Sequence, residues 1–307
     1  MLAATLIRLT ERINTAVTKV SGTLRQNVYE TTGNLGLLAK SLVSEDARYA
    51  RALQKFERRE RANPAEFFGY DATTGELRFF TSDRIRSGPI RDPDDNIVGV
   101  NFPSKPRDGT GPAIFTPEGY AAVHRDYYRG LYSRGNIKVI KNTRFLAPWA
   151  KKKPEDPDPE LVFSRAHANG DEYAIEVNIA EPGASEPHWV KVGVNGSEFG
   201  WILASNEHFK QAARNKPTAQ LIQFSCAPAS GSAARQSAQS LQSAGIGFHV
   251  WSTKETHFSH HIEDAEKTGF IIINDHGTEM KVDDFGNPKE SPWEVFEAPR
   301  NTPERPA

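Results

Sequence analysis

Apolar residues recur with a helical period near the start of the chain. Over residues 2–22 they return every three or four positions, while Arg8, Glu11 and Lys19 lie mostly on the opposite face. A second helical pattern runs over residues 37–61 and ends in charges of both signs, which is typical of a solvated face. The pattern predicts two amphipathic helices. We interpret the first as a core helix, with docking onto a secretion apparatus or chaperone as the alternative.

Short β-like runs replace the helical pattern over residues 67–102. Turn-forming residues interrupt these runs at 71–75, DATTG, and at 92–96, DPDDN. The alternation of strand-forming and turn-forming segments predicts a small group of strands in this part of the chain.

Thr116 followed by Pro117 predicts the start of a helix, because threonine is a favoured N-cap and proline a favoured first helical residue. This helix is expected to run to about Ser133 and to stop at Gly135. We interpret three tyrosines in it as helix packing, namely Tyr127, Tyr128 and Tyr132.

Residues 151–160, KKKPEDPDPE, are charged and rich in proline, and they contain no apolar residue besides proline. Such a composition predicts a linker. The chain is therefore expected to divide into a helical plus β region over residues 1–150 and a second domain over residues 151–307.

Strands and helices alternate after the linker. Strands are expected at Leu161–His167, Tyr173–Val177, Trp189–Val194, Leu221–Ser225, Phe248–Trp251 and Phe270–Ile273. A short helix is expected over Phe209–Arg214, capped at Ser205, and another over Ala233–Ala244, with Gly245 just past its end. Asn195-Gly196 is interpreted as a hairpin-like turn. The alternation predicts an α/β fold whose mainly parallel sheet is flanked by helices.

The overall charge and the cysteine count exclude several classes of protein. The formal net charge is -1, which argues against a general nucleic-acid binder. The single cysteine, Cys226, cannot form an intramolecular disulfide or a structural zinc site with several cysteines. Residues 1–7 lack the basic start of a signal peptide, and no apolar run is long enough to span a bilayer. A cytoplasmic location, or export by a dedicated secretion system, is expected. The sequence predicts no cofactor.

Cys226 is the first candidate for chemistry. It ends the expected strand 220–225 and precedes a loop of small residues that leads into a helix. Ligands of open α/β sheets bind beyond the carboxyl ends of strands, and backbone N–H groups there can lower a thiol pKa and hold an oxyanion. The alternative is a buried, inert cysteine that only packs.

His167 is the second candidate, at the end of another expected strand with Asn169 and Gly170 behind it. Two strand ends can bring a thiol and an imidazole together, so that the imidazole takes the thiol proton and later protonates a leaving amine. A solvent-facing loop histidine is the alternative.

Other histidines are further candidates beside His167. His276, in the Asp-His-Gly sequence 275–277, is the rival partner of Cys226, although residues 274–277 also fit a hairpin turn. The histidines of 256–263 are interpreted as belonging to a surface loop rather than a metal site, because no HExxH arrangement occurs.

Six segments together resemble the caspase-like cysteine peptidase modules of bacterial polymorphic and autoprocessing toxins. These segments are 166–170, 189–196, 209–213, 221–226, 234–241 and 248–251. The resemblance implies a histidine strand, a hairpin, a helix, a cysteine strand, a helix and a further strand, with Cys226 and His167 as a catalytic dyad.

Roles are also expected for residues around the dyad. Ala227 and Gly170 would hold an oxyanion through their backbone N–H groups. A pocket for an acidic substrate residue needs a basic side chain, and Arg165 and Arg235 are near enough in the sequence to supply one. The sequence departs from the family where Ala168 and Asn169 separate His167 from Gly170, and where Ala-Pro follows Cys226 in place of Ser/Thr-Gly.

The leading hypothesis is a bacterial toxin or effector that acts as a cysteine endopeptidase. It implies a protein substrate and, as further partners, a cognate immunity protein or a secretion apparatus. The alternatives are a non-enzymatic binding or structural protein on a degenerate caspase-like scaffold, and a Cys-His acyl-transfer enzyme such as a deamidase.

Overall fold

A computed structural model describes residues 66–105, 108–134, 137–261, 269–280 and 290–298. They belong to one compact unit that extends from Pro64. The two helical patterns expected before residue 62 lie outside the described residues. No helix in the described part of the chain is long and apolar enough to cross a membrane.

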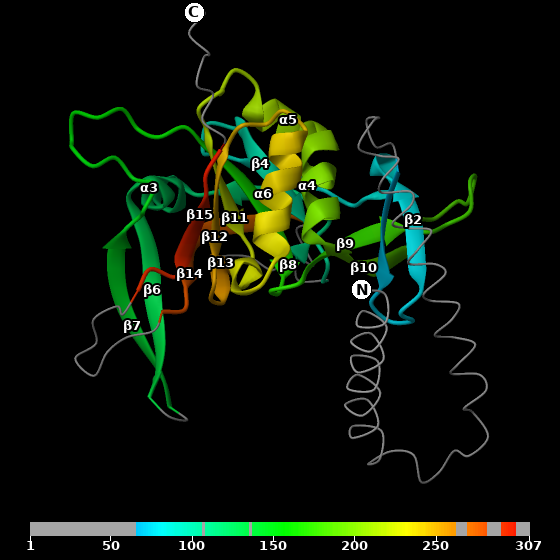
Figure 1. Ribbon diagram of the computed structural model, residues 1–307, viewed down its shortest axis with the longest axis horizontal. Helices are drawn as coiled ribbons and strands as arrows, with labels where there is room; N and C mark the ends of the chain where they lie inside the picture. Colours follow the sequence, from blue (N-terminus) through cyan, green and yellow to red (C-terminus); the bar gives the residue numbers. More distant parts are fainter. Residues whose placement is uncertain (1–65, 106–107, 135–136, 262–268, 281–289, 299–307) are drawn as a thin grey trace, which may run out of the picture. The chain divides into compact units, whose positions relative to one another are not determined.

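A large mixed sheet forms the centre of the molecule (Figure 1). Its strands are β1 (Glu66–Asp71), β2 (Leu77–Thr81), β3 (Gly88–Arg91), β4 (Ile97–Phe102), β5 (Ala113–Phe115), β8 (Leu161–Ala168), β9 (Glu172–Asn178), β10 (Trp189–Asn195), β11 (Gln220–Phe224), β12 (His249–Thr253), β13 (His257–His261), β14 (Ile271–Thr278) and β15 (Trp293–Phe296). One path runs β13-β14-β5-β3-β4-β8-β9-β10-β1-β2, and β11, β12 and β15 continue from β8.

The parallel part of this sheet is smaller than expected. Strand β8 pairs in parallel with β4 on one side and β11 on the other, and β12 continues in parallel from β11. The hairpins β1–β2, β9–β10 and β13–β14 pair antiparallel, since short connections allow no other pairing. The fold is α/β with a mixed sheet, and the expectation of a mainly parallel one is corrected.

Residues 151–160 form a loop without regular structure, but the sheet continues across them. Strand β4, which precedes the loop, pairs directly with β8, which follows it, from Gly99↔Phe163 to Phe102↔Ala166. The residues on the two sides of this loop therefore share one core.

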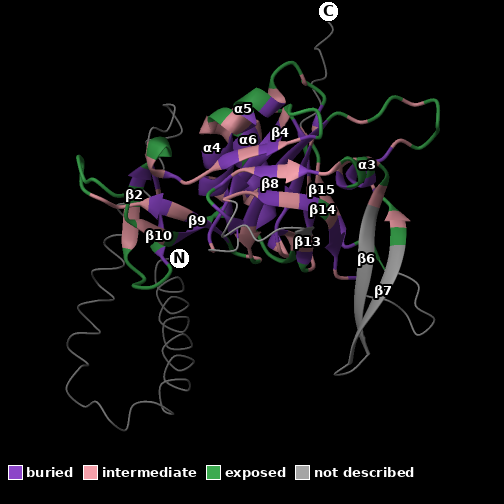
Figure 2. Cartoon of the chain, turned by 180° about the vertical axis from the view of Figure 1, so that it is seen from behind, coloured by how far each residue is buried: buried purple, intermediate pink, exposed green. Residues whose placement is uncertain are grey.

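Helices and aromatic residues cover the two faces of β8 and β11. On one face, α4 (Gly196–Ser205) and α6 (Ala233–Ser243) lie side by side, and α5 (Glu207–Ala213) lies beside β4 (Figure 1). Phe199 and Leu241 pack there against Val162 and Leu221. The other face carries a second cluster that contains Phe163 and Phe224. Figure 2 shows the central strands of the sheet as buried. Because β8 and β11 are covered on both faces, their sequences are nearly continuous apolar runs.

The helix that begins after Thr116 is shorter than expected. Helix α3 spans Pro117–Arg125, and the Thr116 hydroxyl accepts the N–H of Gly119 at 3.0 Å, so the predicted cap is confirmed. The chain then forms β6 (Asp126–Arg134), which pairs with β7 (Ile137–Leu146) as a separate two-stranded sheet. The expected helix packing of the tyrosines is therefore wrong: Tyr127, Tyr128 and Tyr132 belong to a strand. The aromatic residues of β6 and the β-branched residues of β7 favour strand pairing over helix.

Two asparagines cap helices at positions where other features were expected. The side chain of Asn195 accepts the N–H of Glu198 at 2.9 Å and caps α4, so Asn195-Gly196 is not a hairpin turn. Asn206 caps α5 in place of Ser205, because its side chain accepts the N–H of Phe209 at 3.1 Å. Asparagine is among the strongest N-caps.

Residues expected in turns or surface loops near the end of the chain lie in strands. Residues 274–277 continue β14 without a turn, and His276 is buried in that strand. The segment 257–261 is strand β13, and His257 is buried as well. Long-range pairing between these two strands replaces the local turn.

Candidate functional site

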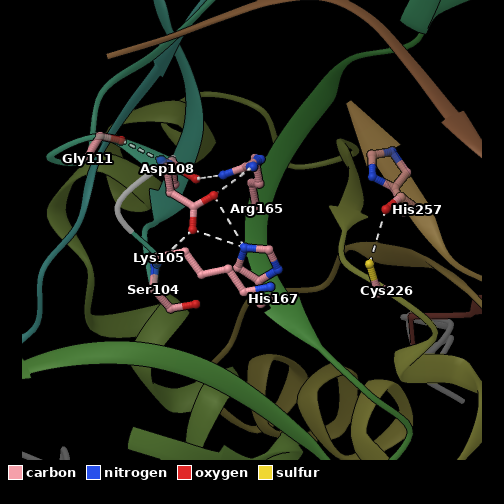
Figure 3. A network of polar contacts seen from close by, with 9 residues as sticks. Ser104, Lys105, Asp108, Gly111, Arg165, His167, Cys226 and His257 are labelled. Carbon is pink, nitrogen blue, oxygen red and sulfur yellow. Dashed lines mark hydrogen bonds and ion pairs between the residues drawn. The ribbon is translucent and has the colours of Figure 1, made fainter. Parts of the chain in front are cut away.

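The carboxyl ends of β8 and β11 lie next to each other. The two strands pair in parallel from Gln220↔Leu161 to Phe224↔Arg165. Cys226 comes two residues after Phe224, and His167 comes two residues after Arg165. Because side chains alternate along a strand, Arg165 and His167 belong to the same face as Phe224, while Cys226 lies just beyond the end of β11. The structure thus brings both expected residues to one edge of the sheet (Figure 3).

His167 is bound to a buried carboxylate that no sequence pattern indicated. Its Nε2 atom lies 3.0 Å from Oδ2 of Asp108. The backbone N–H groups of Ser104 and Lys105 donate to the same oxygen at 3.1 and 2.9 Å. Asp108 lies 59 positions before His167, between β4 and β5, and only the fold brings the two side chains together.

The electrostatics of this network keep Asp108 ionised. Burial alone would raise the pKa of Asp108, but the hydrogen bond from His167 and the charge of Arg165 outweigh it. The pKa of this carboxyl is therefore held well below its usual range. The ionised carboxylate fixes the orientation of the His167 ring through its contact with Nε2.

Arg165 belongs to the same network rather than to open solvent. Its Nη2 atom lies 3.3 Å from Oδ1 of Asp108, and its Nη1 donates to Oδ1 of Asn101 at 3.0 Å. Asn101 in turn donates to the carbonyl of Gly111 at 2.7 Å. The arginine that was expected to receive an acidic substrate residue is thus buried and paired with a carboxylate.

The Cys226 thiol is partly exposed, and its hydrogen bond goes to the backbone. The Sγ atom donates to the carbonyl of His257 at 3.1 Å. Figure 3 shows the thiol directed at His257 and the His167 ring directed at Asp108. In the described conformation, the two candidate groups each contact a different partner.

Ala227 has a strained backbone and a hydrogen-bonded N–H. Its φ of 54° lies in the left-handed region that glycine favours. Its N–H, expected to serve the oxyanion, donates to the carbonyl of Glu255 at 3.0 Å. The segment 255–257 thus accepts hydrogen bonds from both the candidate nucleophile and the residue after it.

The loop after His167 packs against the loop after Cys226. The carbonyl of Gly170 accepts the N–H of Ala233 at 3.0 Å, and a Cβ atom at position 170 would lie 2.8 Å from the Ser230 hydroxyl. A side chain at position 170 would therefore have to displace the Ser230 hydroxyl. This contact ties together the two loops that carry the candidate residues.

Arg235 lies on α6 and is exposed. Its Nη2 atom is 3.5 Å from Oε1 of Glu294, and its guanidinium lies over the ring of Phe296. Like Arg165, it is therefore already paired with a carboxylate.

Two buried histidines lie beside the thiol strand. The ring of Phe224 stacks on His257, with centroids 4.8 Å apart, and also contacts His276. Burial lowers the pKa of His276 to about 4 and that of His257 well below its usual value. Both rings are neutral at pH 7. Within the described residues, no group of three or more His, Cys, Asp or Glu side chains is placed to hold a metal ion.

No protein-family model matches this chain, and neither a curated protein nor a solved structure matches it.

Proposed function

We propose that the protein is a cysteine endopeptidase of caspase-like architecture, with Cys226 as nucleophile and His167 as general acid and base. The observation that carries the proposal is the edge shared by β8 and β11. One strand ends in an imidazole fixed by a buried carboxylate, and its parallel neighbour ends in a partly exposed thiol. Ligands of open α/β sheets bind beyond such strand ends.

The order of elements supports the same proposal. After the histidine strand β8 come the β9–β10 hairpin, helices α4 and α5, the cysteine strand β11, helix α6 and strand β12. The resemblance in the sequence implies the same order of strands, with one helix where the structure has α4 and α5.

The proposed reaction transfers an acyl group through the thiol. His167 takes the thiol proton, and the thiolate attacks the peptide carbonyl carbon. His167 then returns the proton to the leaving amine, which leaves a thioester on Cys226. Water, deprotonated by His167, attacks the thioester carbonyl, the C–S bond breaks, and the carboxylic acid is released while His167 returns the proton to the departing Cys226 thiolate. Asp108 acts as a positioning residue throughout, because it stabilises the imidazolium.

The hydrogen bonds of the site define what this reaction requires. Since Nε2 of His167 is bonded to Asp108, the proton exchange with the thiol takes place at Nδ1. The thiol must leave the carbonyl of His257, and the N–H of Ala227 must leave the carbonyl of Glu255 before it can hold an oxyanion. Movement of the segment 255–257 accomplishes both.

In this proposal the peptidase acts as a bacterial toxin or effector. Its partners are a protein substrate and, in addition, a cognate immunity protein or a secretion apparatus. The resemblance of six sequence segments to toxin modules supports this setting.

One observation favours a second candidate function, a binding protein on the same scaffold. Both groups that the chemistry needs, the thiol and the N–H of Ala227, are satisfied by backbone carbonyls. A scaffold without catalysis would keep such bonds permanently.

Thiol reactivity distinguishes the two candidates. We would measure the rate of Cys226 alkylation by iodoacetamide against pH in the wild type and in His167→Ala, with the exposed His188→Ala as matched control. The peptidase proposal expects an apparent thiol pKa below the ordinary value of about 8.5, raised by His167→Ala alone. A thiol that reacts only after unfolding would identify the binding scaffold.

A further inference from the structure

Lys105 is anchored to the carboxylate that holds His167. Its backbone N–H donates to Oδ2 of Asp108 at 2.9 Å, and its carbonyl accepts the N–H of Asp108 at 2.8 Å. Nε2 of His167 lies 3.0 Å from the same Oδ2 atom. Because both nitrogen atoms contact one oxygen atom, the backbone nitrogen of Lys105 lies within about 6 Å of the imidazole. The bonds of Asp108 therefore fix the position of Lys105 beside the His167 ring.

The side chain of Lys105 extends from this anchor towards His167 (Figure 3). Lysine carries its ammonium group on a flexible four-carbon stem, so the ammonium can reach a group that is bound next to the imidazole. The side chain is only half-buried, and a ligand can therefore approach it from the solvent. Lys105 thus places a cation at the end of β8, beside the candidate acid and base.

No carboxylate in the described part of the chain forms an ion pair with this ammonium. Asp108 already binds two side chains of β8, and its ion pairs do not include the Lys105 side chain. The acidic residues that follow His167 most closely in the sequence, Asp171 and Glu172, are exposed and do not bind it either. A cation that the described protein groups leave unpaired beside the imidazole favours an anionic ligand.

The proposed reaction shows which part of a substrate meets Lys105. His167 faces the leaving amine, because it returns the thiol proton to that amine. Groups that border His167 therefore contact the part of the substrate that follows the cleaved bond. A substrate strand spans about 3.3–3.6 Å per residue, so the lysine stem reaches the first or second residue after the bond.

We propose that Lys105 binds a carboxylate of the substrate on the leaving-amine side of the cleaved bond and makes the protein selective for such substrates. The inference rests on the proposed peptidase function. The carboxylate belongs to an acidic side chain just after the bond or to the free end of the substrate chain, since both present the same oxygens to the ammonium. Arg165, which was expected to receive an acid, is bound to Asp108 and leaves this role to Lys105.

The first test measures cleavage by the full chain. One set of internally quenched peptides has an amidated end and carries Glu or Gln just after the bond, and a second set is neutral with a free or an amidated end. Both sets are offered to the wild type, Lys105→Met and Lys105→Arg, with the exposed Lys152→Met as matched control. We expect a carboxylate to raise the cleavage rate about tenfold in one set, and Lys105→Met alone to lose most of this preference.

The two peptide sets identify the source of the carboxylate. A preference for Glu over Gln assigns it to an acidic side chain, and a preference for a free over an amidated end assigns it to the end of the substrate. Cleavage without either preference, or an equal loss of rate for all peptides in Lys105→Met, overturns the subsite and leaves the peptidase standing.

The second test needs no catalysis. Cys226 is alkylated with iodoacetate or with iodoacetamide, two reagents of similar size that differ by one negative charge, and the product is followed by mass spectrometry. In both reactions the thiolate forms a C–S bond while iodide leaves. We expect the rate ratio of iodoacetate to iodoacetamide to fall about threefold in Lys105→Met and to be retained in Lys105→Arg and Lys152→Met. Thermal unfolding checks that each variant is folded.

The two tests separate the two proposals. A rate ratio that depends on Lys105, without cleavage of any peptide, supports anion binding by Lys105 and overturns the peptidase. A rate ratio that Lys105→Met leaves unchanged places the ammonium away from the thiol and overturns the subsite, whatever the cleavage result.

Discussion

The Nε2 atom of His167 lies 3.0 Å from Oδ2 of Asp108, a carboxylate whose side chain is only 1 % exposed. Because Arg165 contacts the other oxygen of the same carboxylate, a single buried anion holds two cationic or ionisable side chains at the end of β8. The arrangement combines a positioned imidazole with a structural ion pair. Its removal is expected to affect both reactivity and stability.

Replacement of Asp108 by Asn should lower the free energy of unfolding by about 3–5 kcal/mol, because it leaves the Arg165 guanidinium buried without a compensating charge. Urea unfolding at pH 7 measures the loss. Asp158→Asn, which removes an exposed ion pair with Lys151, serves as control and should change stability by less than about 1 kcal/mol. A second substitution, Arg165→Met in the Asp108→Asn background, should restore part of the stability. Equal losses for the two aspartates would contradict the buried role of Asp108.

Acid should weaken the fold through His276. Its folded-state pKa of about 4 lies below the unfolded value of about 6.5, so between these values the unfolded chain binds a proton that the native ring does not. Stability is therefore fully present above about pH 6.5 and falls as the pH drops towards 4, by up to about 1.4 kcal/mol per pH unit for this group. The free energy of unfolding, measured in urea at several pH values between 7 and 5, should fall less steeply with decreasing pH in His276→Phe than in the wild type. His249→Phe, at an exposed histidine, is the reference variant. An equal pH dependence of stability in His276→Phe and in this reference would rule out the contribution of His276.

A graded series at position 227 should reveal the strain next to the thiol. A non-glycine residue at φ 54° costs about 1 kcal/mol, and a β-branched residue costs more. Ala227→Gly should therefore leave the melting temperature unchanged or raise it, while Ala227→Val should lower it by several degrees. The comparison is Ala213→Gly at the end of α5, which should be destabilised by about 0.5–1 kcal/mol. Destabilisation by Ala227→Gly as large as that of Ala213→Gly would show that position 227 is not strained.

The packing of α4 on α6 should tolerate no side chain at Gly196. A Cβ atom there would lie 1.9 Å from the carbonyl oxygen of Ala233, a backbone atom at the start of α6. Gly196→Ala should lower the free energy of unfolding by about 1–3 kcal/mol, because the two helices must separate. Gly247→Ala is the matched control, since nothing lies within 4 Å of its Cβ position. Thermal unfolding of the two variants decides the point, and indistinguishable curves would refute the close approach.

Local patterns predicted the elements that carry the candidate site. The apolar runs of β8 and β11 and the helix α6 are present near the expected residues, because strands buried on both faces and a helix with one apolar face leave clear periodicities. The two candidate residues therefore fall at strand ends, as expected. The sequence of neither segment alone predicts that β8 and β11 are neighbours, and only the strand pairing in the structure shows it.

Long-range contacts explain what local patterns missed. Asp108 gave no signal because its partner is 59 positions away. The end of α3 was misplaced because strand pairing with β7 outweighs the helical propensity of the segment that follows Arg125. The local sequence around His276 fits a turn, but pairing of β14 with β13 and β5 holds this segment in a sheet.

The sheet that crosses residues 151–160 also constrains how the protein can be made. Strand β4 is synthesised before its partner β8, and β5 is synthesised long before its partner β14. The hydrogen bond between Thr116 and Asn274 spans 158 positions and illustrates this separation. Nascent chains of intermediate length therefore carry unpaired strand edges, which favour aggregation. The central sheet cannot close before β14 has been synthesised, so a ribosome stalled between β5 and β14 would present those open edges to chaperones.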